Sequence, residues 1–270
     1  MSRQRNFEAL SFNLVMTLLA VLALALIIAP SLVVVIVSFT SGFSLKFPPP
    51  GYSTRWYVEL WNAWQLQFAA RNSLIVAAWA TGLSVAFGVA AALAISRSKS
   101  FSARLLDSLF MSPLVLPALA FGLAALMFFS LIGMQVSLLT LVIGHTVVCV
   151  PYVVRNTVAA LTQLEPTLLE SSAVLGASRL YTFRRIVLPL IRPGIISGAF
   201  IAFMSSFDNV PVSLFLRDAA TDMLPIRMWQ DLEGKLDVTI AALSSVLIIA
   251  TVALMAIMER STGLSKRLTG

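Results

Sequence analysis

Two side chains suited to nucleophilic chemistry lie four positions apart: His145 and Cys149, the single histidine and the single cysteine of the chain. Positions four apart share one face of an α-helix, so the pair would place a base beside a thiol. Catalysis by such a pair needs a third group that orients the base, and none accompanies it. The same scarcity excludes an internal disulfide and a cysteine–histidine metal site. We therefore predict no catalytic residues, no metal site and no cofactor, in a chain that is not an enzyme.

His145 and Cys149 both lie in apolar sequence, which indicates structural roles. We expect Cys149 to be a buried, unreactive thiol. We expect His145 to hydrogen-bond a neighbouring helix, because a single histidine without aligned carboxylates makes a poor proton relay.

Asp208 is the one charged residue in an apolar stretch between Pro193 and Leu216. A carboxylate at membrane depth costs a few kcal/mol on insertion scales. Such a group usually faces the interior of a helix bundle or a watery cavity, so an intramembrane acid is a functional candidate by default.

Three roles for Asp208 remain open. Facing a pore, its carboxylate would attract a cationic amine and repel anions, and the rings of Phe203 and Phe207 would add cation–π stabilisation of about 1 kcal/mol. These three residues are the predicted substrate pathway. Alternatively, Asp208 forms an ion pair with a partner such as Arg217, or it caps a helix break near Pro211.

The composition shows that these residues sit in a membrane. Of the 270 residues, 59 % are hydrophobic and 11 % are charged, and the mean hydropathy is +0.91. Roughly a quarter of the residues of a soluble domain are charged, so this chain has too little polar surface for a water-soluble globule. An ordinary soluble enzyme, a disordered protein and a nucleic-acid-binding module are excluded, despite the net charge of +7. The chain is expected to contact the lipid bilayer and no nucleic acid.

Stretches without charge locate six transmembrane helices in an all-α membrane protein. A helix needs about 20 apolar residues to cross the hydrocarbon core. The gap between Asp107 and Arg155 is long enough for two helices, separated near Gly133. The predicted spans are Leu14–Phe39, Ser73–Ile95, Leu109–Leu131, Val136–Val154, Pro193–Leu216 and Val238–Met258. The first is too long to be a cleaved signal peptide.

The distribution of arginine and lysine sets the orientation. With the N-terminus inside, thirteen basic residues fall in inner segments and six in outer segments. Basic residues are enriched on the cytoplasmic side, so both termini are predicted to be cytoplasmic in this multi-pass protein. The prediction comprises cytoplasmic ends at residues 1–13 and 259–270, a first transmembrane helix over 14–39 and a periplasmic loop over 40–72.

Both long outer loops have features beyond those of a connector. The loop over 40–72 contains Trp56, Tyr57, Trp61 and Trp64, and this aromatic cluster predicts a short helix at the membrane interface. The loop from Leu216 to Asp237 is acidic. Its role stays open between a solvated loop and a gate or receptor-docking segment.

The cytoplasmic segment 163–190 is too long and too regular for a simple connector. Pro166 suits the first position of a helix, and Gly176 suits the left-handed residue just beyond its end. Ser178 is placed to cap a second helix that begins at the next residue. Pro189 then begins the next membrane segment. The sequence thus predicts a helix–turn–helix on the cytoplasmic face.

Within this segment lies a motif similar to the signature of ABC importer permeases, E-A-A-x3-G-x9-I-x-L-P. The matching positions are Glu170, Ser171, Ser172, Gly176, Ile186, Leu188 and Pro189. The two serines replace alanines, and both are small enough to keep the helix closely packed. The spacing of the other five positions is intact, and the motif precedes the fifth of six predicted spans, as it does in the family.

The resemblance implies a type I ABC importer permease (MetI-like) fold over residues 73–258, with the first helix added in front. It also implies that the loop over 163–190 couples to separate ABC ATPase subunits. No G-x4-G-K-[ST] motif occurs, so ATP hydrolysis is expected in a partner. A second permease subunit, forming a homodimer or heterodimer, and a periplasmic or extracellular substrate-binding protein complete the expected partners. The expected location is the bacterial cytoplasmic (inner) membrane.

Within the family, the sequence looks like the spermidine/putrescine branch. The resemblance lies in Ser205–Ser213, Leu224–Trp229 and Asn72–Leu74. The implied cargo is a polyamine or a similar cationic amine; the alternatives are an aminophosphonate, an amino acid derivative, iron or a thiamine-like solute. An ion-coupled secondary transporter is a further alternative, but it would require more charge within the membrane and usually an internal repeat.

Overall fold

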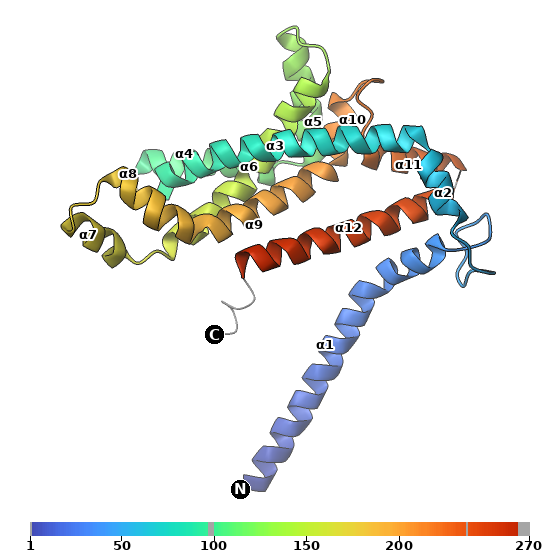
Figure 1. Cartoon of the computed structure of the whole chain (residues 1–270), viewed down its shortest axis with the longest axis horizontal. Helices are drawn as coiled ribbons and strands as arrows, with labels where there is room; N and C mark the ends of the chain where they lie inside the picture. Colours follow the sequence, from blue (N-terminus) through green and yellow to red (C-terminus); the bar gives the residue numbers. More distant parts are fainter. Residues whose placement is uncertain (1, 97–99, 236, 264–270) are drawn as a thin grey trace. The chain divides into compact units, whose positions relative to one another are not determined.

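The computed structural model describes residues 2–96, 100–235 and 237–263, and it is helical apart from loops and one isolated bridge between Thr40 and Tyr52. The helices, labelled as in Figure 1, are α1 (Ser2–Ser38), α2 (Arg55–Asn62), α3 (Trp64–Ser96), α4 (Phe101–Val115), α5 (Ala118–Leu131), α6 (Leu138–Thr162), α7 (Pro166–Val174), α8 (Arg179–Thr182), the π-helix η1 (Phe183–Val187), α9 (Leu188–Phe207), α10 (Val210–Leu216), α11 (Leu224–Lys235) and α12 (Thr239–Thr262).

Five helices in the described part of the chain are long and apolar enough to cross a membrane. They are Phe12–Ser38, Trp64–Ser96, Leu138–Thr162, Arg179–Phe207 and Thr239–Thr262. A sixth span arises if the bent pair of α4 and α5 is counted as one. This confirms the predicted all-α membrane architecture, although two of the six expected spans differ in shape.

The third span is broken, and the expectation of one helix over Leu109–Leu131 is wrong. Helix α4 ends at Val115 and α5 begins at Ala118, at an angle of 106°. The cause is Pro117, which lacks a backbone N–H and clashes with a helical preceding residue. Leu116 is accordingly extended, with φ −74° and ψ 141°.

The fifth span also differs from the expected single helix over Pro193–Leu216. Its helix already starts at Arg179 and continues through η1 and α9 to Phe207, so Pro189 lies inside it rather than beginning it. After a break at Asp208 and Asn209 the chain forms the short helix α10.

Capping residues explain where α10 begins. The Asn209 side chain accepts a hydrogen bond from the Val212 backbone N–H at 2.9 Å, as an N-cap does. Pro211 occupies the first turn, where its missing N–H is not needed, and it cannot continue α9. The sequence Asn-Val-Pro therefore ends one helix and starts another.

The described residues form two compact units, of which the first contains the N-terminal segment through Ala63 and Asp231–Val252. In this unit Trp56 is buried against Val238 and Ala242. The Tyr57 hydroxyl lies 2.7 Å from the Ser38 hydroxyl of α1. The expected short helix exists as α2, but burial of Trp56 contradicts an interfacial position for that ring.

Trp61 and Trp64 fit the expected interfacial helix better than Trp56 does, since their side chains are 81 % and 69 % exposed. Trp64 belongs to α3, however, because that helix begins nine residues before the predicted Ser73. Amphipathic rings of this kind favour the membrane–water boundary.

The second unit contains Trp64–Gln230 and the segment from Ala253 onward. Its centre is formed by α3, α6 and α9, which pack along one another (Figure 1). Small residues permit the close approach: a Cβ on Gly198 of α9 would lie 3.0 Å from the Val153 Cα of α6, and one on Gly88 of α3 would lie 2.8 Å from the Val153 Cβ. Within this unit, α7 and α8 lie at one end of the bundle and α10 at the other (Figure 1).

Candidate functional site

The loop over residues 163–190 has the local geometry predicted from its sequence. Pro166 occupies the first turn of α7, and Gly176 adopts φ +77° just after that helix. The Ser178 hydroxyl accepts a hydrogen bond from the Tyr181 backbone N–H at 3.2 Å and caps α8. The turn is fixed further by Ser172, which is buried and whose hydroxyl lies 2.7 Å from that of Thr182. The helix–turn–helix is thus confirmed.

The α7–α8 turn exposes apolar side chains around a hollow. Val174 and Leu175 are 86 % and 85 % exposed, and Leu168 and Leu169 are 42 % and 41 % exposed. The hollow has a volume of about 680 Å³ and includes Tyr181 in its wall. Exposed apolar side chains on a regular helix are typical of a surface that another protein covers.

Only part of the predicted motif lines this hollow. The structure brings Ser171, Ser172, Gly176 and Ile186 into its wall. Glu170 is exposed on α7 and does not line the hollow, whereas Leu188 and Pro189 are exposed on α9. Leu168 and Leu175, which the sequence places on the apolar face of the predicted helix–turn–helix, also line the wall, whereas Tyr181 was not identified from the sequence.

The three residues of the predicted substrate pathway lie together at the end of α9. The rings of Phe203 and Phe207 stack with centroids 6.1 Å apart and an interplanar angle of 18°, and both are half-buried. Asp208, the C-terminal cap residue, is exposed. Its carboxylate makes no hydrogen bond or ion pair with any residue that the structure describes.

The structure removes two of the alternatives for Asp208. Arg217 pairs with Asp222 at 2.9 Å, so it is not the partner of Asp208. The helix break near Pro211 does exist, but the side chain that caps it is that of Asn209. Asp208 is therefore an exposed acid that directly follows a pair of stacked aromatic residues in the chain.

His145 of α6 is fully buried, and its ring is hydrogen-bonded to both α9 and α10. Its Nδ1 lies 2.8 Å from the Ser206 Oγ of α9, and its Nε2 lies 3.1 Å from the Ser213 Oγ of α10. The Cys149 Sγ, also buried, donates to the Ala202 carbonyl at 3.3 Å. The expected hydrogen bond from His145 to a neighbouring helix is confirmed. Among the described residues no group of three or more metal-ligating side chains occurs.

Comparison with known proteins places this geometry in a family. Residues 84–267 match the family described as binding-protein-dependent transport system inner membrane component. The chain belongs to this family. It is the permease subunit of an ABC importer, as the importer signature at Glu170–Pro189 predicts. The matched region begins inside α3, so α1 and the first outer loop lie outside it.

Named relatives and solved structures agree with this assignment. The permease is 28 % identical over 236 residues to the spermidine/putrescine transport system permease protein PotC of Haemophilus influenzae, covering 86 % of this chain and 90 % of that protein. It is 30 % identical over 227 residues to the putrescine transport system permease protein PotI of Escherichia coli, covering 82 % of this chain and 80 % of that protein.

Two solved ABC transporters share the fold. A bacterial transporter involved in the import of the acidic polysaccharide alginate superposes with a TM-score of 0.70 at 14 % identity, covering 92 % of this chain and 95 % of that one. The MetNI methionine transporter in an inward-facing conformation gives a TM-score of 0.62 at 18 % identity, covering 74 % and 96 %. The predicted type I importer permease fold is confirmed.

The acidic loop over residues 216–237 of the permease is hydrogen-bonded to α3. The Asn72 side chain donates to the Asp222 carbonyl at 3.0 Å, and the Ser73 hydroxyl accepts from the Leu224 backbone N–H at 2.9 Å. Within the loop, hydrogen bonds from Thr221, first from its hydroxyl, hold the pKa of the Asp218 carboxyl below its usual range. These bonds argue against a simply solvated loop and leave a gating or docking role open.

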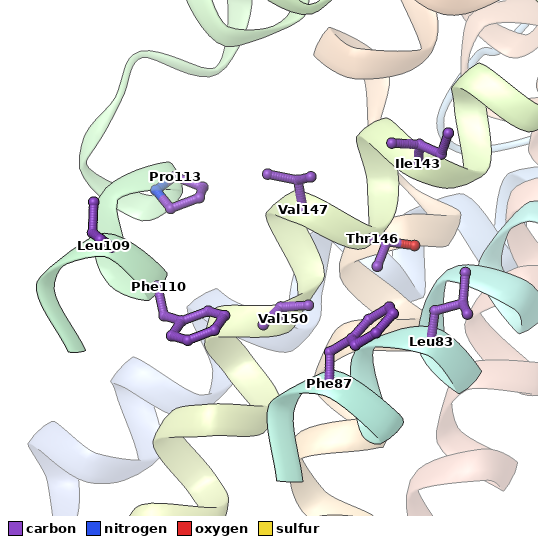
Figure 2. Close-up of a pocket in the computed structure, with 9 residues that line it drawn as sticks. All are labelled: Leu83, Phe87, Leu109, Phe110, Pro113, Ile143, Thr146, Val147 and Val150. Carbon is purple, nitrogen blue, oxygen red and sulfur yellow. The ribbon is translucent and has the colours of Figure 1, made fainter. Parts of the chain in front are cut away.

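A second hollow in the permease is apolar and does not suit a charged cargo. It lies among α3, α4 and α6 and has a volume of about 340 Å³. Figure 2 shows the side chains in its wall: Leu83, Phe87, Leu109, Phe110, Pro113, Ile143, Thr146, Val147 and Val150. Its one polar side chain is that of Thr146, whose hydroxyl donates to the Val142 carbonyl of its own helix, and the wall has no charged side chain to pair with an ammonium group. A cation here would lose its hydration without compensation.

Proposed function

We propose that this permease imports a polyamine, such as putrescine or spermidine, or a similar cationic amine, using ATP hydrolysed by separate subunits. The named relatives that cover most of the chain are permeases of spermidine and putrescine transport systems. The observation that supports a cationic cargo is the exposed Asp208 carboxylate, which has no partner among the described residues and directly follows the stacked Phe203–Phe207 pair in the chain. A carboxylate with adjacent aromatic faces is the chemistry that recognises an ammonium group.

The loop over residues 163–190 is proposed to dock on the ATPase subunits. Its support is the signature at Glu170, Ser171, Ser172, Gly176, Ile186, Leu188 and Pro189, together with the apolar side chains that α7 exposes. In docking, Leu168 and Leu175 would bury apolar surface, and Glu170 would fix the register by a charge interaction. Closure of the ATPase pair would then move α7 and, through α8 and η1, the membrane helix α9.

The complete transporter is proposed to contain a second permease subunit, two ATPase subunits and a substrate-binding protein. The alginate and methionine proteins that share the fold belong to ABC transporters, which supports an assembly with ATPase subunits. The N-terminal segment 1–13, the loop 163–190 and the C-terminal segment 259–270 are assigned to the cytoplasm, and the loop 40–72 to the periplasm. The excess of basic residues in the inner segments supports this orientation.

Uptake of labelled putrescine and spermidine tests the proposal in cells that express the full transporter, with and without this chain. Choline, an aminophosphonate and an amino acid serve as unlabelled competitors. We expect uptake that requires this chain and ATP and that only polyamines compete. Uptake blocked by another competitor would replace the cargo, and uptake without ATP dependence would contradict the ABC mechanism and favour an ion-coupled transporter.

Gly176→Ala tests whether the turn between α7 and α8 matters for coupling. At φ +77° an alanine is strained by roughly 1 kcal/mol, although no atom lies within 4 Å of the new Cβ. We expect the substitution to lower ATP-driven uptake about fivefold, because the docking surface is misplaced. The measurement is the initial uptake rate at matched membrane expression.

Gly133→Ala is the matched control for this prediction. Gly133 has φ +73° and open space around it, but it lies in the turn between α5 and α6. The backbone strain is therefore the same while the docking turn is unchanged, and uptake is expected to stay within about twofold of the wild type. Equal losses in both variants would show that strain alone, and not the position of the turn, limits transport.

A further inference from the structure

We propose that His145 is a positioning residue: by bridging Ser206 and Ser213 across the break in the fifth span, it holds Asp208 in place for a cationic cargo. The proposal rests on the proposed function, in which Asp208 faces the cargo. His145 itself is buried and would touch no substrate.

The His145 ring contacts one residue on each side of the break. Ser206 lies in the last turn of α9 and Ser213 in the middle of α10, so the break at Asp208 and Asn209 falls between them. The imidazole Nδ1 contacts one hydroxyl at 2.8 Å and Nε2 contacts the other at 3.1 Å. Because both nitrogens belong to one rigid ring, the ring fixes the separation of the two hydroxyls.

Local hydrogen bonds close each half-helix at the break. The Asn209 N–H donates to the Ser206 carbonyl at 3.3 Å and ends α9. The Asn209 side chain accepts from the Val212 N–H at 2.9 Å and starts α10. His145, from α6, supplies the side-chain link that engages both halves at once.

Breaking the bridge would cost free energy, because all three of its residues are fully buried. His145, Ser206 and Ser213 each have no exposed surface. A buried hydroxyl that loses its partner keeps the whole cost of its desolvation, so the two serines resist separation from the ring. The neighbouring Gly144 allows this close approach, since a Cβ there would lie 2.5 Å from the Leu216 Cδ1 of α10.

Asp208 is the residue that depends on this arrangement. It terminates α9 two residues after Ser206, and its carboxylate has no partner among the described residues that would hold it in place. The position of the carboxylate is therefore set by the backbone of the break. If the ring is removed, the break relaxes and the carboxylate changes its position.

Two readouts in the assembled transporter test the bridge. The first is the KM and maximal rate of putrescine uptake by His145→Leu. The second is the labelling rate of Asp208→Cys by a positively charged methanethiosulfonate, measured on this chain with and without His145→Leu. Cys149 is the chain's single cysteine, so a Cys149→Ser background leaves position 208 as the only thiol of the chain.

His145→Leu is expected to raise the KM about tenfold with a maximal rate within about twofold, because the cargo contact is misplaced while the rest of the cycle is kept. It is also expected to change the labelling rate at position 208 about tenfold. Ser213→Ala removes only one bond and should shift both readouts in the same direction by less. Adding it to His145→Leu should have no further effect, since the bridge is already absent.

Thr146→Val is the matched control, because it removes a buried hydroxyl from the next residue of α6 whose hydrogen bond stays within that helix at 2.6 Å. Both readouts should match the wild type. Equal effects of Thr146→Val and His145→Leu, or unchanged KM and labelling in His145→Leu, would overturn the proposal. If His145→Leu does not reach the membrane, Ser213→Ala takes its place: a shift in KM and labelling supports the proposal, and unchanged values overturn it.

The labelling readout separates this proposal from the proposed function, because it involves no cargo. An altered labelling rate in a transporter that imports no cationic solute supports the bridge and refutes the polyamine assignment. An unaltered labelling rate in a working polyamine importer overturns the bridge and leaves the assignment intact.

Discussion

Glu170→Ala is expected to abolish ATP-driven uptake while the transporter stays assembled. In the proposed docking, the exposed Glu170 carboxylate becomes a desolvated partner of the ATPase subunit. Truncating one member of a buried, hydrogen-bonded charge pair costs about 2–5 kcal/mol, because the other charge is left unpaired. Uptake should therefore fall by at least about tenfold. The measurements are initial uptake and cargo-stimulated ATP hydrolysis in membrane vesicles, with copurification of the subunits as the check on assembly.

Glu165→Ala is the control for this prediction. Glu165 is an exposed acid in the same loop, directly before α7, and it lies outside the signature. Its substitution removes an equal charge but no docking contact, so uptake should remain within about twofold. Normal uptake in Glu170→Ala, or an equal loss in Glu165→Ala, would contradict the role assigned to Glu170.

Asp208→Asn is expected to reduce uptake of putrescine by more than about tenfold, without loss of the subunits from the membrane. The amide has nearly the same shape as the carboxylate but no charge. A pair of opposite charges 4 Å apart is stabilised by about 1 kcal/mol in water and about 4 kcal/mol near a protein surface, so losing it is sufficient for this effect. The decisive quantity is the uptake rate at low cargo concentration, where binding limits transport.

Asp107→Asn serves as the comparison, since Asp107 lies on α4 and away from the break in the fifth span. It changes the net charge by the same amount and should leave uptake near the wild-type rate. Full transport by Asp208→Asn would mean that the cation is recognised elsewhere, for example by the binding protein alone.

The helices and turn of the loop over residues 163–190 could be predicted from the sequence almost completely. Helix ends follow local rules that one residue satisfies: a proline in the first turn, a serine at the cap and a glycine at positive φ. Pro166, Gly176 and Ser178 each act at the position where they stand in the chain. The roles of Glu170 and the hollow could not be derived in this way, because they depend on a partner surface.

The break in the third span was missed, and the break near Pro211 was considered only as one alternative for Asp208, for a definite physical reason. Charge-free length measures whether a segment can reside in lipid, but it says nothing about continuity of the backbone. The information was present in Pro117 and in Asn209 followed by Pro211, which local rules identify as helix breaks. When a long apolar stretch is judged by its composition alone, a single proline or asparagine does not change the assignment, so these breaks are overlooked.

The partners of His145 could not be predicted at all. Ser206 and Ser213 lie 61 and 68 positions further along the chain. A hydrogen bond over such a separation follows from the packing of α6 against α9 and α10, which no periodicity in one sequence reveals. The expectation of a neighbouring-helix partner was correct in kind because a polar group in an apolar environment must be paired.

Helices α5 and α10 are the second halves of two different broken spans, and they are in close packing contact at Gly122. A Cβ on Gly122 of α5 would lie 2.7 Å from the Pro211 carbonyl oxygen and 2.7 Å from the Phe215 ring. A side chain larger than hydrogen at position 122 would therefore push α5 and α10 apart. The length of one side chain, at position 122, thus sets the spacing between the second halves of the two broken spans.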